Sequence, residues 1–390
     1  MKLNLWTARL VAAGVVSLGS VVQAEEASSQ VLTALSSTTL SGYVDTSAIW
    51  KFGTGNANLP GRAFDGTSKM DGFNLNVVKL TVEKPLDEGQ WSAGYKVDLL
   101  FGPDAVAYNT ATGTGDFSLK DAYVALRAPI GNGVDFKIGT FATVLGYEVF
   151  ESPNNPNYSR SYGWILESTQ HTGVLASYQV NESLYLAAGV ANTHTAGLNP
   201  RGNRLGAPAD ESEKTYMGLI SLTAPESFGS LKGATLYAAV VDGLAGNSLD
   251  TTSTYVGVTL PTPMDGLAVG AAYDYRFNGP NMTTSGNNWA YAVAGYLSYQ
   301  ATEKLKLNGR VDYTNGSNGT WYTNFDTYGS QNELISYTFT TDYSLWANVI
   351  SRAELRWDHS LKSDRPYGGV SSYGGDNNAV TLALNVIYRF

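Results

Sequence analysis

The sequence predicts an all-β fold, a transmembrane antiparallel up-and-down β-barrel of about 16 strands. Apolar and polar residues alternate with a period of two over segments of roughly 10–13 residues, the length of a tilted strand that crosses a bilayer. The connections between these segments alternate between short and long. No segment after the N-terminal region has the ~18 consecutive apolar residues that indicate a membrane-spanning helix.

The N-terminal region has the features of an export signal. Lys2 and Arg9 are positive, residues 10–22 are apolar, and Val22, Gln23 and Ala24 form a cleavage site with small residues. We therefore expect residues 1–24 to be a signal peptide. Residues 25–39 do not alternate and are rich in Ser and Thr, so we expect a short periplasmic segment there. The barrel is predicted to occupy residues 40–390.

The alternation is clearest at residues 305–314. One face of this segment reads Leu, Leu, Gly, Val and Tyr, and the other carries Lys306, Asn308, Arg310, Asp312 and Thr314. Because a strand directs successive side chains to opposite faces, the segment has an apolar and a charged face. The same pattern recurs at 90–101, 267–277, 347–358 and 379–390. Strands of a soluble sandwich are usually ~5–6 residues long, which disfavours that fold. A change of phase near 77–78 predicts a β-bulge.

The connection lengths predict the topology. Short periplasmic turns are expected at 85–89, 129–133, 180–183, 224–230, 261–266, 301–304 and 341–344. Long outer loops are expected at 53–71, 102–116, 140–168, 192–212, 242–250, 278–286, 314–331 and 359–377. Short turns on one side and long loops on the other are typical of barrels in the outer membrane of Gram-negative bacteria. We therefore expect a cell outer membrane location.

A barrel of this size encloses an aqueous channel, whereas eight-stranded barrels are filled by their own side chains. The charged faces must line that channel, because Arg or Lys on the lipid side costs about 2–4 kcal/mol at the bilayer midplane. The predicted pore-lining residues are Lys79, Lys96, Asp98, Arg127, Asp274, Arg276, Lys306, Arg310, Asp312, Arg352, Glu354 and Arg356. Two compatible interpretations stay open: a transverse field that favours polar solutes, or ion pairs that only keep the wall wet.

The longest connection, at 140–168, is predicted to narrow the pore. It carries five bulky aromatic residues between Tyr147 and Trp164 that can pack on the wall, and long outer loops can fold inward. We expect Glu148, Glu151 and Arg160 to form the constriction. A lid on the outer surface is the alternative. The sequence leaves cation and anion selectivity open, since acidic residues of the loop oppose arginines of the wall.

Composition excludes several classes of function. Cysteine is absent and histidine occurs three times, so disulfides, thiolate chemistry and a zinc site are not expected. The net charge of −9 makes a nucleic-acid partner improbable on electrostatic grounds. No metal and no cofactor are predicted. The acidic cluster of Asp210, Glu211 and Glu213 is interpreted as a solvated loop in preference to a calcium site.

The expected partners are outer-membrane lipid and small hydrophilic solutes. A homotrimer is a further expectation, by analogy with porins of 16 strands. Small outward residues such as Ala347, Ser351 and Ala353 would allow close contact between barrels.

Several motifs resemble a known family. The similarity is densest from Gly42 to about Thr195, and includes Glu83-Lys84-Pro85-Leu86-Asp87-Glu88, Gly146-Tyr147-Glu148-Val149-Phe150 and Asn157-Tyr158-Ser159-Arg160-Ser161-Tyr162. It continues at Ser351-Arg352-Ala353-Glu354-Leu355-Arg356-Trp357-Asp358. As a set, these motifs resemble a family of bacterial outer-membrane β-barrel porins described as OmpL-like. The resemblance implies a porin and says little about its substrate.

The predicted function is passive diffusion of small hydrophilic solutes and ions through a water-filled pore. An adhesin or structural barrel without an open pore is the alternative. An outer-membrane hydrolase is less favoured, because it needs a Ser–His pair oriented by a third group. His171 lies near Ser168, and His359 lies beside Ser360, but neither is in a Gly-x-Ser-x-Gly context. No enzymatic activity is therefore expected.

Overall fold

A computed structural model describes residues 37–390 except 54, 57, 59–61, 63–64, 66–68, 90, 108–116, 204–211, 247–248, 280–287, 318–320, 322–331, 363–364 and 369–374. The predicted signal peptide at 1–24 lies outside the described residues. Most of the segment predicted at 25–39 also lies outside them. The first strand begins at Thr39.

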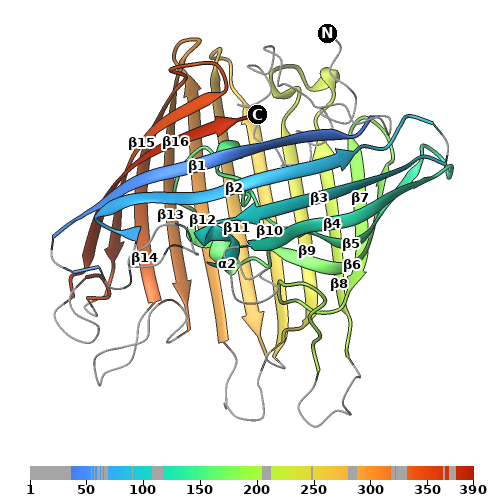
Figure 1. Cartoon of the computed structure of the whole chain (residues 1–390), viewed down its shortest axis with the longest axis horizontal. Coiled ribbons are helices and arrows are strands. Elements are labelled where there is room, and N and C mark those ends of the chain that lie inside the picture. Colours follow the sequence, from blue (N-terminus) through green and yellow to red (C-terminus); the bar gives the residue numbers. More distant parts are fainter. Residues whose placement is uncertain are drawn as a thin grey trace.

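Within the described residues, sixteen strands form one closed antiparallel barrel, as predicted (Figure 1). Each strand pairs with its neighbours in sequence, and β1 pairs with β16. The strands are β1 (Thr39–Phe52), β2 (Gly72–Lys84), β3 (Ala93–Phe101), β4 (Phe117–Ala128), β5 (Val134–Ala142), β6 (Gln170–Gln179), β7 (Leu184–Ala191), β8 (Thr215–Thr223), β9 (Thr235–Leu244), β10 (Asp250–Pro261), β11 (Leu267–Asn278), β12 (Asn288–Gln300), β13 (Leu305–Gly316), β14 (Asn332–Tyr343), β15 (Val349–Ser360) and β16 (Asn378–Arg389).

The connections divide the barrel into a short-turn end and a long-loop end. The first strand, β1, begins at the short-turn end, and the last strand, β16, ends there. The turn between β8 and β9 is longer than predicted, because it contains a 3₁₀ helix, η4 (Glu226–Leu231). The second long loop contains α2 (Pro103–Ala107), and the third contains η3 (Ser152–Asn154) and α3 (Tyr162–Leu166). Among the described residues, every helix is too short to cross a membrane.

Two bulges interrupt the strand register. The first leaves Asn76 of β2 without a partner on β1, next to the phase change predicted near 77–78. The second, between β3 and β4, leaves Lys120 outside the register and was not predicted. A bulge adds one residue to a strand and turns two consecutive side chains to the same side. Lys120 and Asp121 are accordingly both buried.

The barrel closes where β1 meets the end of β16. The backbone N–H of Gly42 donates to the carbonyl of Phe390 at 2.9 Å, and the N–H of Phe390 donates back at 3.0 Å. A Cβ at Gly42 would lie 2.1 Å from the carbonyl oxygen of Lys79 and 2.9 Å from the Phe390 ring. Only glycine therefore fits this position of the seam.

Gly42→Val is expected to reduce the yield of closed barrel strongly, because the new side chain forces β1 away from β2 and exposes unpaired backbone groups to lipid. The folded fraction can be measured by the difference in electrophoretic mobility between heated and unheated samples in detergent. Gly295→Val is the matched control, since a Cβ at Gly295 meets no atom within 4 Å. Equal folded fractions for the two variants would contradict this reading of the seam.

Candidate functional site

On strands with a charged face, such as β13 and β15, that face points into the barrel. On β13, Arg310 and Asp312 are buried, whereas Val311 between them is 46% exposed. On β15, Arg356 is buried between two exposed apolar neighbours, Leu355 and Trp357. The twelve predicted pore-lining residues, from Lys79 to Arg356, all occupy inward-facing positions of this kind. Their role in solute passage stays a prediction.

The third long loop, residues 143–169, runs along the inside of the barrel. Its helix α3 packs against β11, β12 and β13. Tyr162, at the start of α3, donates its backbone N–H to Asp312 at 3.0 Å and its hydroxyl to Asp358 at 2.7 Å. Tyr147 stacks on Tyr296 of β12, with ring centroids 4.1 Å apart. The loop is therefore bonded to the inner wall along much of its length.

Glu354 of β15 anchors the middle of the loop. Its carboxylate accepts the backbone N–H groups of Tyr158 at 2.6 Å and Ser159 at 3.0 Å. Thr340 of β14 donates to the same carboxylate at 2.8 Å. A hydrogen bond to a carboxylate contributes more to stability than one between neutral groups. Glu354 therefore fixes the path of the loop through its backbone.

Arg310 links the loop to β13. Its guanidinium lies 2.8 Å from Glu148 of the loop and 3.0 Å from Asp312 of its own strand. It also donates to the carbonyl oxygens of Ser159 at 2.9 Å and Arg160 at 3.2 Å. All the charged side chains in this group are almost completely buried. Such a group is stable only while its donors and acceptors are matched.

Two further arginines of β15 bind the loop through its carbonyls. Arg356 donates to the carbonyl of Arg160 at 2.6 Å, and its charge is matched by Asp358 at 2.7 Å. Arg352 donates to the carbonyl of Asn155 at 2.9 Å and pairs with Asp342 of β14 at 2.6 Å. The wall arginines therefore hold loop backbone and wall carboxylates at the same time.

The three predicted constriction residues have different environments. Glu148 is buried and accepts the backbone N–H and the hydroxyl of Ser161 at 2.7 and 2.8 Å, besides pairing with Arg310. Arg160 is fully buried, and donates to loop carbonyls. The Glu151 side chain is 14% exposed. Of these three, Glu151 therefore reaches furthest towards solvent. That they form the constriction stays a prediction.

Glu151 is held by two lysines, and sequence reasoning missed one of them. Lys79 lies 2.6 Å from its carboxylate, and Lys120 lies 3.0 Å from it. The two cations hold the pKa of Glu151 well below its usual range, against the opposing effect of burial. Strict alternation along β4 would have directed Lys120 towards lipid, but the bulge turns it into the barrel. The consecutive charges Lys120 and Asp121 were the signal that could have indicated the bulge.

The remaining predicted wall residues fall into two groups. Paired residues include Asp98, which lies 2.7 Å from Lys79 and 3.5 Å from Lys96, and Arg127, which lies 2.6 Å from Asp135. Asp274, Arg276 and Lys306 have no ion pair in the described part of the chain. Ion pairs thus involve only part of the predicted wall, and both earlier interpretations stay predictions.

The first and second long loops also enter the barrel, which the sequence did not reveal. Arg62 of the first loop lies 2.8 Å from Asp104 of α2 and 2.9 Å from Asp65. Lys69 lies 2.6 Å from the same Asp104. These side chains are buried beside Asp45 of β1. Loop residues have no periodic pattern, so no sequence signal predicted this network.

Glu167 follows α3 and meets Asp274 of β11 as a hydrogen-bond partner. Both carboxyl groups are buried. Burial raises the pKa of Glu167 well above its usual range, and the charge of Asp274 raises it further. The pair therefore holds a proton on Glu167 at pH values where a solvated glutamate is ionised.

Alkaline pH is expected to loosen the end of the third loop. A raised folded-state pKa gives stability that is complete below the ordinary pKa and lost as pH rises through the raised value. Unfolding temperatures of the native chain in detergent should therefore fall as the pH rises above the ordinary pKa of a glutamate. Glu167→Gln keeps the hydrogen bond without the titration and should reduce that fall by several degrees. The same fall in the variant would assign the pH dependence to another group.

The Ser–His arrangement considered for a hydrolase is also buried. The hydroxyl of Ser168 lies 3.0 Å from Nε2 of His171, and the other ring nitrogen faces the carbonyl of Thr193 at 3.4 Å. In the described residues no carboxylate hydrogen-bonds to His171. Those residues also contain no cluster suited to a metal ion, and Asp210 and Glu211 lie outside them.

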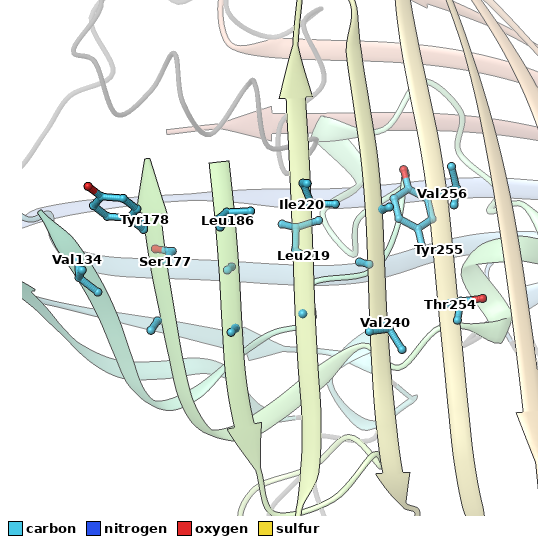
Figure 2. Close-up of a pocket in the computed structure, with 16 residues that line it drawn as sticks. Val134, Ser177, Tyr178, Leu186, Leu219, Ile220, Val240, Thr254, Tyr255 and Val256 are labelled. Carbon is cyan, nitrogen blue, oxygen red and sulfur yellow. The ribbon is translucent and has the colours of Figure 1, made fainter. Parts of the chain in front are cut away.

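A separate apolar groove of about 750 Å³ lies over β5–β10 (Figure 2). The small residues Ala176, Ala188 and Gly218 are direct partners across β6, β7 and β8, and they make the floor shallow. Their positions alternate with the buried inward ones, so the groove faces outward. It is lipid-facing surface and not the channel.

A closed membrane barrel with a charged inner wall, and with its third loop bonded inside, defines an outer-membrane porin. The chain belongs to the family described as "Putative beta-barrel porin-2, OmpL-like", which matches residues 37–390. It is accordingly a protein of the outer membrane, as predicted.

Solved structures support the same fold. An anion-selective porin from Comamonas acidovorans has a TM-score of 0.60 at 12% identity, over 91% of this chain and 99% of that one. The outer membrane channel DcaP of Acinetobacter baumannii has a TM-score of 0.57 at 13% identity, over 90% and 97%. The trimer form of OmpT from Vibrio cholerae also has a TM-score of 0.57 at 13% identity, over 90% and 99%. A comparison with curated proteins found no significant match.

Proposed function

We propose that this porin passes small hydrophilic solutes and ions passively, through an aqueous space between its third loop and the opposite wall. The observation that carries the proposal is the partial exposure of charged inner-wall side chains beside a loop that is bonded inside the barrel. The Lys96 side chain is 24% exposed, and Lys137 and Lys306 are half-buried. Charged side chains that retain water mark the path of a polar solute.

The loop contacts support a narrowing of the lumen by residues 143–169. The loop is bonded to β13, β14 and β15, while α3 packs against β11–β13. Glu151 is partly exposed and is held by Lys79 and Lys120, so it is the loop carboxylate that we place beside the solute. We propose that Glu148 and Arg160 hold the constriction in place.

Stepwise conductance in a planar bilayer tests the proposal. Purified, folded protein is expected to insert as discrete channels of constant size, because a lumen with half-exposed charges holds water. Folded protein that inserts without conductance would favour the alternative, an adhesin or structural barrel with a closed lumen. We propose no catalytic function, since the Ser168–His171 pair is buried and lacks a carboxylate partner among the described residues.

We further propose that the barrel assembles as a homotrimer in outer-membrane lipid. The trimer form of the structurally similar Vibrio cholerae protein supports this, as does the outward position of Ser351 and Ala353 on β15. Native mass measurement in detergent should give three chains per particle, and a monomer mass alone would oppose the proposal.

We also propose that residues 1–24 are removed on export and that residues 25–39 stay in the periplasm. Mass measurement of the exported protein should then place its first residue at Glu25.

A further inference from the structure

The acidic residues of the inner wall are mostly neutralised by neighbouring cations. Described pairs are Asp98 with Lys79, Asp121 with Lys120, Asp135 with Arg127, Asp312 with Arg310, Asp342 with Arg352 and Asp358 with Arg356. Glu148 and Glu151 of the loop are paired in the same way. A solute in the lumen therefore meets little uncompensated negative charge from these groups.

Among the described residues, Arg276 and three further cations of the inner wall differ from this pattern. Lys137, Lys306 and Arg389 are half-buried, and no described carboxylate lies within 4.0 Å of any of them. Lys137 lies over the Tyr123 ring, 5.2 Å from its centre. Lys306 is opposite Asp342 in the register, but Asp342 is bound by Arg352 at 2.6 Å. The charged neighbour of Arg389 is Arg352, a second cation.

The three further cations lie at the same end of the barrel, whereas Arg276 is near the opposite end, on β11. Lys137 is near the start of β5, Lys306 is near the start of β13, and Arg389 ends β16, so all three are at the short-turn end. The three strands are distributed around the barrel. On β2, Glu83 is an inner carboxylate of this end without a cation within 4.0 Å, and it is opposite Lys96 in the register. Among the inner-wall side chains of this end that lack an ion pair, cations therefore outnumber carboxylates.

We propose that this ring of unpaired cations makes the pore selective for small anions, and that Lys137, Lys306 and Arg389 determine that selectivity. The charges face an aqueous space enclosed by a low-dielectric wall, which focuses their field on the lumen. Chloride, small carboxylates and phosphates are the ligand class. The inference rests on the proposed pore function, and it specifies that anions pass in preference to cations.

The test is the reversal potential of the native chain and of two triple variants in a potassium chloride gradient. The lumen variant carries Lys137→Gln, Lys306→Gln and Arg389→Gln. The control variant carries Lys214→Gln, Lys232→Gln and Lys304→Gln, which removes the same charge from exposed loop and turn positions. Heated and unheated electrophoresis verifies that both variants fold.

The native chain is expected to favour chloride over potassium. The lumen variant should lower the chloride-to-potassium permeability ratio by roughly five- to sixtyfold, because three charges at ~10 Å favour chloride and disfavour potassium by about two- to eightfold each, with and without salt screening. The control should keep the native ratio. An unselective or cation-selective native pore would overturn the inference and leave the pore function intact, as would equal ratios in the two variants. Absence of any conductance would overturn both.

Discussion

Replacing Arg310 with methionine is expected to detach the third loop from β13 and to lower the free energy of unfolding by about 3–5 kcal/mol. The arginine is fully buried, and its loss leaves Glu148 and Asp312 without the cation that holds them at 2.8 and 3.0 Å. A loop that lies away from the wall should widen the channel and move within it. Single-channel currents should therefore become larger and noisier, and the unfolding midpoint in denaturant should fall.

Lys362→Met is the matched control for this result. Lys362 pairs with Glu333 at 3.1 Å, but its side chain is 43% exposed and that of Glu333 is 24% exposed. A pair of this kind contributes about 1 kcal/mol or less. If Arg310→Met and Lys362→Met had equal stabilities and native currents, the buried charge group would not be what holds the loop.

Removal of the third loop is expected to raise the single-channel conductance several-fold. Ala142 and Gln170 are direct partners on β5 and β6, so a linker of about six Gly and Ser residues can replace 144–167 without disturbing the barrel. The carbonyl partners of Arg310, Arg352 and Arg356 disappear in this variant, but water fills the widened lumen and hydrates them. A lumen of sixteen strands without its loop is a wide aqueous channel.

The matched control replaces η4, Glu226–Leu231, with Gly and Ser residues. This segment is exposed at the short-turn end, and none of its residues is buried. Its replacement should leave the conductance unchanged. Native conductance after removal of the third loop would mean that the loop does not form the constriction, even though it is bonded inside the barrel.

The alternation of apolar and polar residues along the strands made most of the barrel predictable. On β13, strict alternation placed Arg310 and Asp312 on the inner face, and the structure has them there. The connection lengths predicted the hairpin order, because an antiparallel barrel leaves few alternatives. Because charged side chains are unfavourable in lipid, the charged faces could be predicted to point into the barrel.

The partners of the inner charges were not predictable in the same way. Arg62 meets Asp104 across 42 residues, and Glu148 meets Arg310 across 162, and no periodic signal relates such positions. Lys120 was missed because a bulge breaks the alternation on which the prediction rests. Glu148 and Arg160 were predicted to form the constriction, which stays a prediction. Their burial was not predicted, because it depends on the loop path, which the wall arginines and Glu354 determine.

The bonds between the third loop and β15 also have a consequence for the order of folding. The loop follows β5, yet Glu354 accepts the N–H of Tyr158 across 196 residues of chain. Its binding surface therefore does not exist until the last quarter of the polypeptide has paired into the sheet. Contacts so distant in sequence form late, since the entropy of closing the intervening chain must be overcome first. A nascent barrel thus passes through a stage with an unobstructed interior, and capture of the loop is the event that ends its permeability to larger molecules.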